Sequence, residues 1–160
     1  LRAALLVTRA TPLRGSGDVA GGSAPGQVRV VADHLNVSGG SLFPAPGMVS
    51  AGWDARLTER LGSLRGVSGS SVVALVPGPL RPSPAESRVL ASVGADVAVT
   101  DSVAEAMALA SRGVSVSALT YLDAPAAGGN LGRAQLSLRQ ASGVTLAAVE
   151  EILRSLRAGS

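Results

Sequence analysis

The chain has 160 residues, 46% of them hydrophobic, and its mean hydropathy is +0.35. This is enough apolar material for a packed core and argues against disorder, so we expect one domain over residues 1–160. There is no cysteine and the only histidine is His34, which excludes disulfides, thiolate zinc sites and multi-histidine metal centres.

The 14 basic residues are all arginines, and they are scattered beside 11 acidic residues, for a net charge of +3. No basic stripe or aromatic stacking platform is present, so we expect no nucleic-acid partner. The apolar runs are shorter than the roughly 18 residues of a membrane span, and segment 1–7 is too short for a signal peptide. We therefore expect a cytoplasmic protein with no membrane partner. The first residue, Leu1, suggests a fragment or a processed product.

Apolar, β-branched runs of strand length alternate with helical patterns along the chain. The expected strands are 3–7, 28–32, 71–76, 96–100 and 114–119. The expected helices are 84–93, 102–112 and 144–157. This alternation predicts an α/β fold.

Two helices are marked by the residues at their ends. Segment 83–86 supplies a serine N-cap, a proline at the first helical position and a capping-box glutamate. Segment 102–105 repeats the capping-box spacing. Gly94 and Gly113 follow these helices and are expected to end them.

Segments 10–27 and 38–52 are long, irregular and rich in Gly, Pro and Ser. Loops of this length are usually either functional or mobile. The glycines at 15 and 17 are not followed by the Lys and Ser/Thr of a phosphate-binding loop. We therefore favour surface loops for both segments.

Several segments match the pattern of a known family. Segment 76–96 keeps Gly78-Pro79, an Ala-Glu-x-Arg-x-Leu run at 85–90 and Gly-Ala-Asp at 94–96. Segment 33–37 reads Asp-His-Leu-Asn-Val, and segment 5–10 is similar to a strand ending in Val-Thr-Asn-Ala-Ala-Gly-Gly. On these residues the chain resembles the C-terminal portion of the trimeric purine nucleoside phosphorylases. The resemblance implies a three-layer α/β fold, with a central mixed β-sheet flanked by helices and the N-terminal part missing.

The resemblance also assigns ligand positions. The purine-binding positions are Ala10, Val73, Arg81, Pro82 and Thr100, and the phosphate-binding positions are Ala10 and Asp101. Ala124 stands where the family keeps its catalytic Asn, Asp123 would substitute if the loop shifted by one residue, and Leu136 stands near the position of a ribose-contacting His.

Several of these positions depart from the family pattern, and four of them bear directly on ligand binding and catalysis. Arg81 replaces an aromatic residue, Pro82 a Glu, Asp101 a phosphate-binding Ser and Ala124 the catalytic Asn. Pro82 and Ala124 cannot form the purine hydrogen bonds that assist the leaving base, and assistance of this kind is worth about 10²- to 10⁴-fold in rate. A carboxylate at position 101 would repel phosphate by about 1 to 4 kcal/mol.

Simpler interpretations are favoured for the individual residues. Asp123 is more simply a turn residue, and Arg81 a solvated loop arginine that could also bind an anion. His34, with Asp33 before it, is expected to be a hydrogen-bonded structural residue, and Glu86 a helix cap.

We therefore expect an inactive or incomplete homologue of the enzyme that cleaves purine nucleosides with phosphate to free base and ribose 1-phosphate. Its ligand would be a purine nucleoside or base, with no cofactor and with inorganic phosphate as co-substrate if it is active. One alternative is the C-terminal part of an active phosphorylase, and another is a small-ligand-binding or assembly module without catalysis. A homo-oligomer, a trimer by resemblance, or a hetero-oligomer with a complete subunit is expected, because missing strands would expose sheet edges.

Overall fold

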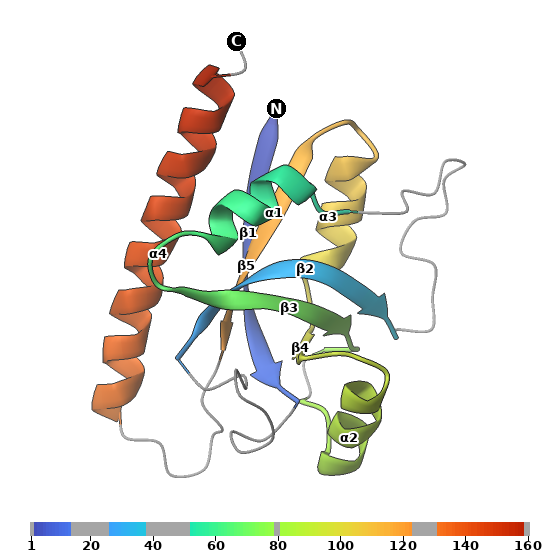
Figure 1. The fold of residues 1–160 in the computed structure, drawn as a ribbon. Coiled ribbons are helices and arrows are strands. Elements are labelled where there is room, and N and C mark those ends of the chain that lie inside the picture. The colour runs from blue at the N-terminus through green and yellow to red at the C-terminus, as the bar shows by residue number, and fades with distance from the viewer. Residues whose placement is uncertain (1, 14–25, 38–51, 79–80, 123–130, 159–160) are drawn as a thin grey trace.

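The computed structural model describes residues 2–13, 26–37, 52–78, 81–122 and 131–158, with five strands and four helices among them (Figure 1). In chain order these are β1 (Ala3–Pro12), β2 (Val28–Asn36), α1 (Ala55–Gly62), β3 (Val67–Leu75), α2 (Pro84–Ser92), β4 (Val97–Val99), α3 (Val103–Ala110), β5 (Ser115–Leu122) and α4 (Leu131–Ala158). The mixed α/β class predicted from the sequence is confirmed.

The strands close into a ring in the order β1-β4-β3-β2-β5, and each strand pairs with two neighbours. Strand β1 runs parallel to β5 from Ala3 to Ala10, and its last two residues pair antiparallel with β4. On the far side, the start of β2 pairs antiparallel with β5. The sheet is mixed, as expected, but it closes into a barrel instead of forming an open central layer, because β1 continues to Pro12 and reaches β4.

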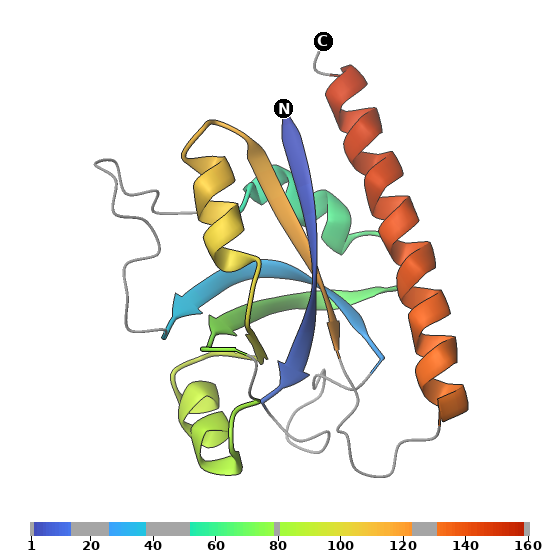
Figure 2. The same ribbon diagram turned by 180° about the vertical axis from the view of Figure 1, so that it is seen from behind.

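The helices cover different sides of this ring. Helix α4 runs along one side of the strands and α3 along the other, in the views from the front and from behind (Figures 1 and 2). The side chains of α1 and α4 pack together over the start of β2. Helix α2 contributes Leu90 to a smaller cluster at the opposite end.

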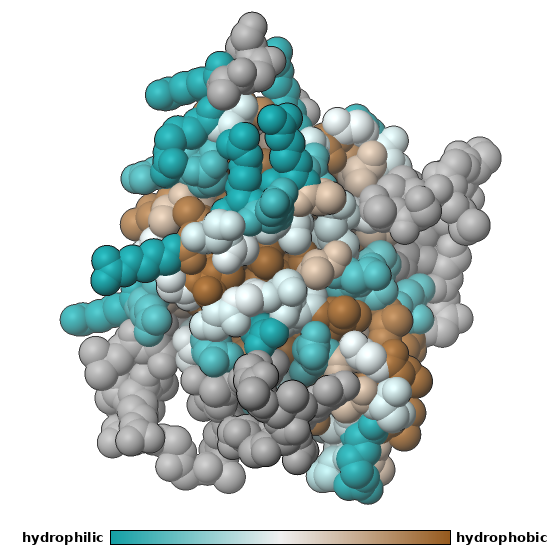
Figure 3. All heavy atoms as spheres, in the orientation of Figure 1, coloured by the Kyte–Doolittle hydropathy of each residue, from teal (hydrophilic) through white to brown (hydrophobic). Residues whose placement is uncertain are grey.

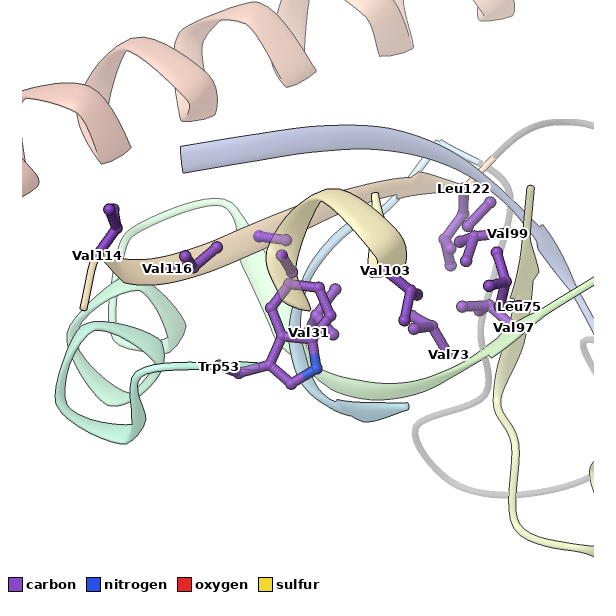
Figure 4. Close-up of a cluster of buried hydrophobic side chains, with 13 residues drawn as sticks. Val31, Trp53, Val73, Leu75, Val97, Val99, Val103, Val114, Val116 and Leu122 are labelled. Atoms are coloured by element: carbon purple, nitrogen blue, oxygen red, sulfur yellow. The ribbon is translucent and has the colours of Figure 1, made fainter. Parts of the chain in front are cut away.

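The largest buried cluster joins α3 to the inner faces of the strands (Figure 4). Its labelled members include Val31, Trp53, Val73, Val103 and Leu122. Burying an aliphatic side chain of this size stabilises the fold by roughly 1.5 to 3 kcal/mol. Val31 and Val73 belong to the apolar runs from which strands were predicted, whereas Val103 comes from α3 and Leu122 from the end of β5 beyond the predicted run.

Trp53 also forms a polar contact at the rim of this cluster. Its indole Nε1–H donates a hydrogen bond to Nδ1 of His34 on β2 at 3.3 Å, and the two rings meet edge to face. The side chain of His34 is only 16% exposed. His34 is therefore a hydrogen-bonded residue of the fold, as expected from its position after a buried strand.

Two of the three predicted helices begin and end close to the expected residues, but their caps differ. At α2 the capping box is confirmed: the Ser83 hydroxyl accepts from the Glu86 N–H at 3.3 Å, and the Glu86 carboxylate accepts from the Ser83 N–H at 2.6 Å. These bonds lower the pKa of Glu86. The capping box predicted at Ser102 is wrong, because Ser102 has a left-handed backbone with φ 70° and its hydroxyl bonds to Asp101 instead.

Helix α4 begins at Leu131, well before the expected residue 144, and α1 was missed entirely. Helix α1 is eight residues long and follows segment 38–52, which sequence patterns assign to a loop. Asp54 caps it, and Leu57 and Leu61 form its buried face. A single pair of apolar residues four positions apart is too short a pattern to predict a helix.

One buried hydroxyl provides a test of the packing. The side chain of Ser71 on β3 is 1% exposed, and within the described part of the chain its Oγ has no hydrogen-bond partner. An unpaired buried hydroxyl costs roughly 1 to 3 kcal/mol, so Ser71→Ala is expected to raise the free energy of unfolding by about 1 kcal/mol in urea denaturation.

Ser117 on β5 is the matched control. It is also fully buried, but its hydroxyl lies 3.3 Å from that of Thr58. Ser117→Ala should therefore lower the free energy of unfolding. Equal destabilisation by the two substitutions would show that the Ser71 hydroxyl is satisfied.

Candidate functional site

A cavity of about 460 Å³ opens where β3 and β4 end and where the second half of β1 passes beside β4. Its lining mixes backbone of buried strand residues with polar and charged side chains. The lining residues are Val7, Thr8, Arg9, Ala10, Thr11, Val76, Arg81, Pro82, Ala98, Val99, Thr100 and Asp101.

Five residues selected from the sequence line this one cavity. Ala10 comes from β1, Arg81 and Pro82 lie just before α2, and Thr100 and Asp101 follow β4. They meet because β3 and β4 are parallel and end at the same edge, while β1 pairs with β4 from the other side. The ring closure thus brings together positions that are up to 91 residues apart in the sequence.

The other selected residues are elsewhere or outside the described residues. Val73 is 1% exposed, belongs to the largest core cluster and is not among the lining residues of this cavity. Asp123 and Ala124 lie outside the described residues, as does the side chain of Leu136.

Asp101 is held against the wall of the cavity by two hydroxyl groups. The Thr8 hydroxyl, on a side chain that is 4% exposed, donates to Oδ1 of Asp101. The Ser102 hydroxyl donates to the same oxygen at 3.1 Å. This network links β1 to the turn between β4 and α3. Thr8 was not selected from the sequence, because nothing in its local pattern indicates a partner 93 positions away.

The turn before α2 closes tightly on the same wall. A Cβ added to Gly78 would lie 3.1 Å from Cβ of Thr100, closer than ordinary van der Waals contact. Gly78, the first residue of the Gly-Pro pair in the sequence motif, therefore allows this turn to approach the end of β4.

The described lining offers groups that can hydrogen-bond to a ligand, but it lacks a pair of groups that could catalyse proton transfer. Its side-chain donors are threonine hydroxyls and the guanidinium groups of Arg9 and Arg81, and its one carboxylate belongs to Asp101. It contains no histidine, and Pro82 offers neither a side-chain acceptor nor an N–H. A general acid and base in hydrogen-bond reach of a substrate would be needed for proton-transfer catalysis, and these lining residues do not supply such a pair.

A second cavity, of about 260 Å³, lies at the other end of β1 and β5 and includes Asp54, Arg56 and Arg60. Burial raises the pKa of Asp54, but hydrogen bonds from Leu57 N–H, the Ser115 hydroxyl and Arg56 N–H, with the charge of Arg56, outweigh it and leave the pKa below 3.8. The carboxylate is thus used to cap α1, and we regard the first cavity as the candidate site.

The described residues show neither a metal-binding cluster nor a membrane-spanning helix. In the part of the chain that the structure describes, no three His, Asp or Glu side chains are grouped as a metal site would require. None of the described helices has the length and apolar character needed to cross a membrane.

Comparison with known proteins gives matches of fold only. No family model matches the sequence, and no curated protein matches it. The solved structure of Schistosoma purine nucleoside phosphorylase with hypoxanthine is similar, with a TM-score of 0.71 at 18% identity, over 96% of this chain and 61% of that one. The same enzyme with guanosine gives a TM-score of 0.69 at 19% identity, over 93% of this chain and 61% of that one.

The Schistosoma mansoni enzyme in complex with inosine is matched over 93% of this chain and 59% of that chain, with a TM-score of 0.69. The chain thus spans about 60% of the length of these solved structures. The expected likeness to purine nucleoside phosphorylases is confirmed for the fold, and the chain has part of that fold.

The cap at Asp54 predicts a pH dependence of stability. Asp54→Ala should lower the free energy of unfolding by about 1 kcal/mol at pH 7, because the α1 cap is lost. The pKa of Asp54 is lower in the folded chain than its ordinary value of 3.8. The contribution of its charge is therefore complete above the unfolded pKa and is lost as pH falls through the folded pKa.

Denaturation curves at several pH values can check this. The difference between wild type and Asp54→Ala should shrink below pH 3.8 and stay constant at neutral pH. Asp54→Asn keeps a capping oxygen without a charge and should remove the acid-dependent part alone. A difference between wild type and Asp54→Asn that does not change with pH would contradict the assignment.

Proposed function

We propose that this domain binds a purine base or purine nucleoside and does not cleave it. The observation that supports the proposal is the convergence of Ala10, Arg81, Pro82, Thr100 and Asp101 on one cavity. The similar solved structures hold hypoxanthine, inosine and guanosine, which are ligands of those proteins. Cavities of roughly 300 to 1,000 Å³ are typical of small-molecule sites, and this one is within that range.

The absence of cleavage follows from the chemistry of phosphorolysis. In that reaction phosphate attacks the anomeric carbon while negative charge moves into the leaving base. The phosphate position by resemblance is Asp101, whose carboxylate disfavours an anion by about 1 to 4 kcal/mol. Pro82 cannot accept a hydrogen bond from the purine edge, and an unpaired buried edge costs about 1 to 3 kcal/mol. We therefore propose that the domain, residues 1–160, is a degenerate homologue of these enzymes.

We also propose that the protein associates with copies of itself through the outer face of α4. Three large apolar side chains lie exposed on that helix at spacings of three and four, namely Leu146 (66%), Val149 (41%) and Leu153 (50%). In Figure 3, brown hydrophobic surface is visible between teal hydrophilic side chains on the side of the molecule where α4 runs. Leu146 also borders an apolar cavity together with Val7 and Tyr121 of the sheet. A copy of the same chain would cover this face, whereas the strand edges are paired within the ring.

Ligand binding and turnover test the first proposal. Purified protein should bind hypoxanthine in calorimetry but release no base from inosine or guanosine in the presence of inorganic phosphate. Turnover near the ~10 s⁻¹ of an ordinary enzyme would favour the alternative of an active phosphorylase.

Pro82→Glu should strengthen hypoxanthine binding by about 0.5 to 1.5 kcal/mol, because it returns one acceptor to the purine edge. Ala85→Glu, on an exposed residue of α2 outside the cavity lining, is the matched control and should leave binding unchanged. An unchanged affinity in both variants would show that the purine edge does not face position 82.

Light scattering tests the association. The wild type should have a mass that is a multiple of 15.8 kDa, a trimer by the resemblance, and Leu146→Gln with Leu153→Gln should reduce it. Val89→Gln with Val93→Gln changes exposed apolar residues at α2 and should have no effect. A monodisperse wild-type monomer at micromolar concentration would contradict the proposal.

A further inference from the structure

Two positions in the cavity lining carry arginines where the purine nucleoside phosphorylase pattern has uncharged residues. Arg81 stands at the position of an aromatic residue, and Arg9 at the position of the Asn in the strand motif. Arg9 comes from β1 and Arg81 from the segment before α2, yet both line the same cavity. Both differences replace an uncharged residue by arginine. Each therefore makes the electrostatic potential of this site more positive.

The described residues of the lining carry a net positive charge. Its charged side chains are Arg9, Arg81 and Asp101, two cations and one anion. Oδ1 of the Asp101 carboxylate already accepts hydrogen bonds from the hydroxyl groups of Thr8 and Ser102. These bonds partly compensate its negative charge. Both arginine residues are exposed, and both belong to the lining of this cavity. Guanidinium groups bind phosphate through paired, charge-assisted hydrogen bonds.

The positions of these charged residues favour a phosphate that is attached to the ligand over free inorganic phosphate. The co-substrate position by resemblance is at Asp101, where a carboxylate repels a free phosphate. Arg81 instead stands where the family's aromatic residue contacts sugar or base, beside Pro82 at the purine edge. A phosphate that meets the arginines rather than Asp101 would therefore be one that is attached to the sugar of the ligand.

We infer that this cavity binds a purine nucleoside monophosphate, with its phosphate held by Arg9 and Arg81. The inference rests on the proposed function, because it assumes that the cavity takes a purine. It goes beyond that function by naming the anionic group of the ligand and the two residues that select it.

Calorimetry with four probes tests the inference: guanosine 5′-monophosphate, guanosine, hypoxanthine and inorganic phosphate. The monophosphate should bind at least about tenfold more tightly than guanosine, as expected for added hydrogen bonds between charged groups. Arg9→Gln and Arg81→Gln should each remove most of that advantage, so that the ratio of the affinities for the monophosphate and for guanosine falls toward one. Arg88→Gln, on an exposed α2 residue outside the lining, is the matched control and should change neither. Circular dichroism checks that each variant is folded.

The outcomes separate the two proposals. Equal affinity for guanosine and its monophosphate would overturn this inference and leave the proposed purine site intact. Binding of inorganic phosphate as tightly as the monophosphate would overturn it in favour of a free-anion site. No binding of any purine compound by the folded protein would overturn the proposed function, and the inference with it.

Discussion

Strand β1 pairs with β5 over eight consecutive residues and then with β4 at its last two, and these two sets of hydrogen bonds close the five strands into a ring. The rest of the structure depends on this closure. It encloses the core around Val31, Val73 and Val97, and it places the second half of β1 beside the end of β4. The buried Thr8 hydroxyl then meets Asp101, so one polar contact secures the junction at which the cavity forms. A hydrogen bond to a carboxylate in such a partly buried place is stronger than a neutral one.

Much of the fold could be predicted because its signals are local. The β-branched runs located all five strands, and the Ser83 capping box located α2 almost to the residue. Closure of the ring could not be predicted, because it depends on which distant strands pair and on β1 continuing past Ala10. Helix α1 was missed because only Leu57 and Leu61 mark its buried face. Ser102 has the same spacing to a glutamate as Ser83, but it does not form a capping box. Its hydroxyl donates a hydrogen bond to Asp101 in the turn after β4 instead.

Only part of the cavity lining was selected from the sequence. Ala10, Arg81, Pro82, Thr100 and Asp101 were selected by resemblance, and all of them line one cavity. Val73 was selected in the same way and lies in the core, because a sequence motif does not specify which face of a strand is inside. Thr8 lay within a motif but gave no signal, since its role arises from a tertiary contact. A fold match at 18 to 19% identity supports the architecture and leaves the chemistry to be argued from the side chains.

The hydrogen bond between Trp53 and His34 has a spectroscopic consequence. Trp53 is the only tryptophan and His34 the only histidine in the chain. In their hydrogen bond the indole N–H is the donor and Nδ1 of the imidazole is the acceptor. All tryptophan emission therefore originates from one buried ring that is hydrogen-bonded to a residue of β2, and the fluorescence of the native protein reports on the junction between β2 and α1 without any label.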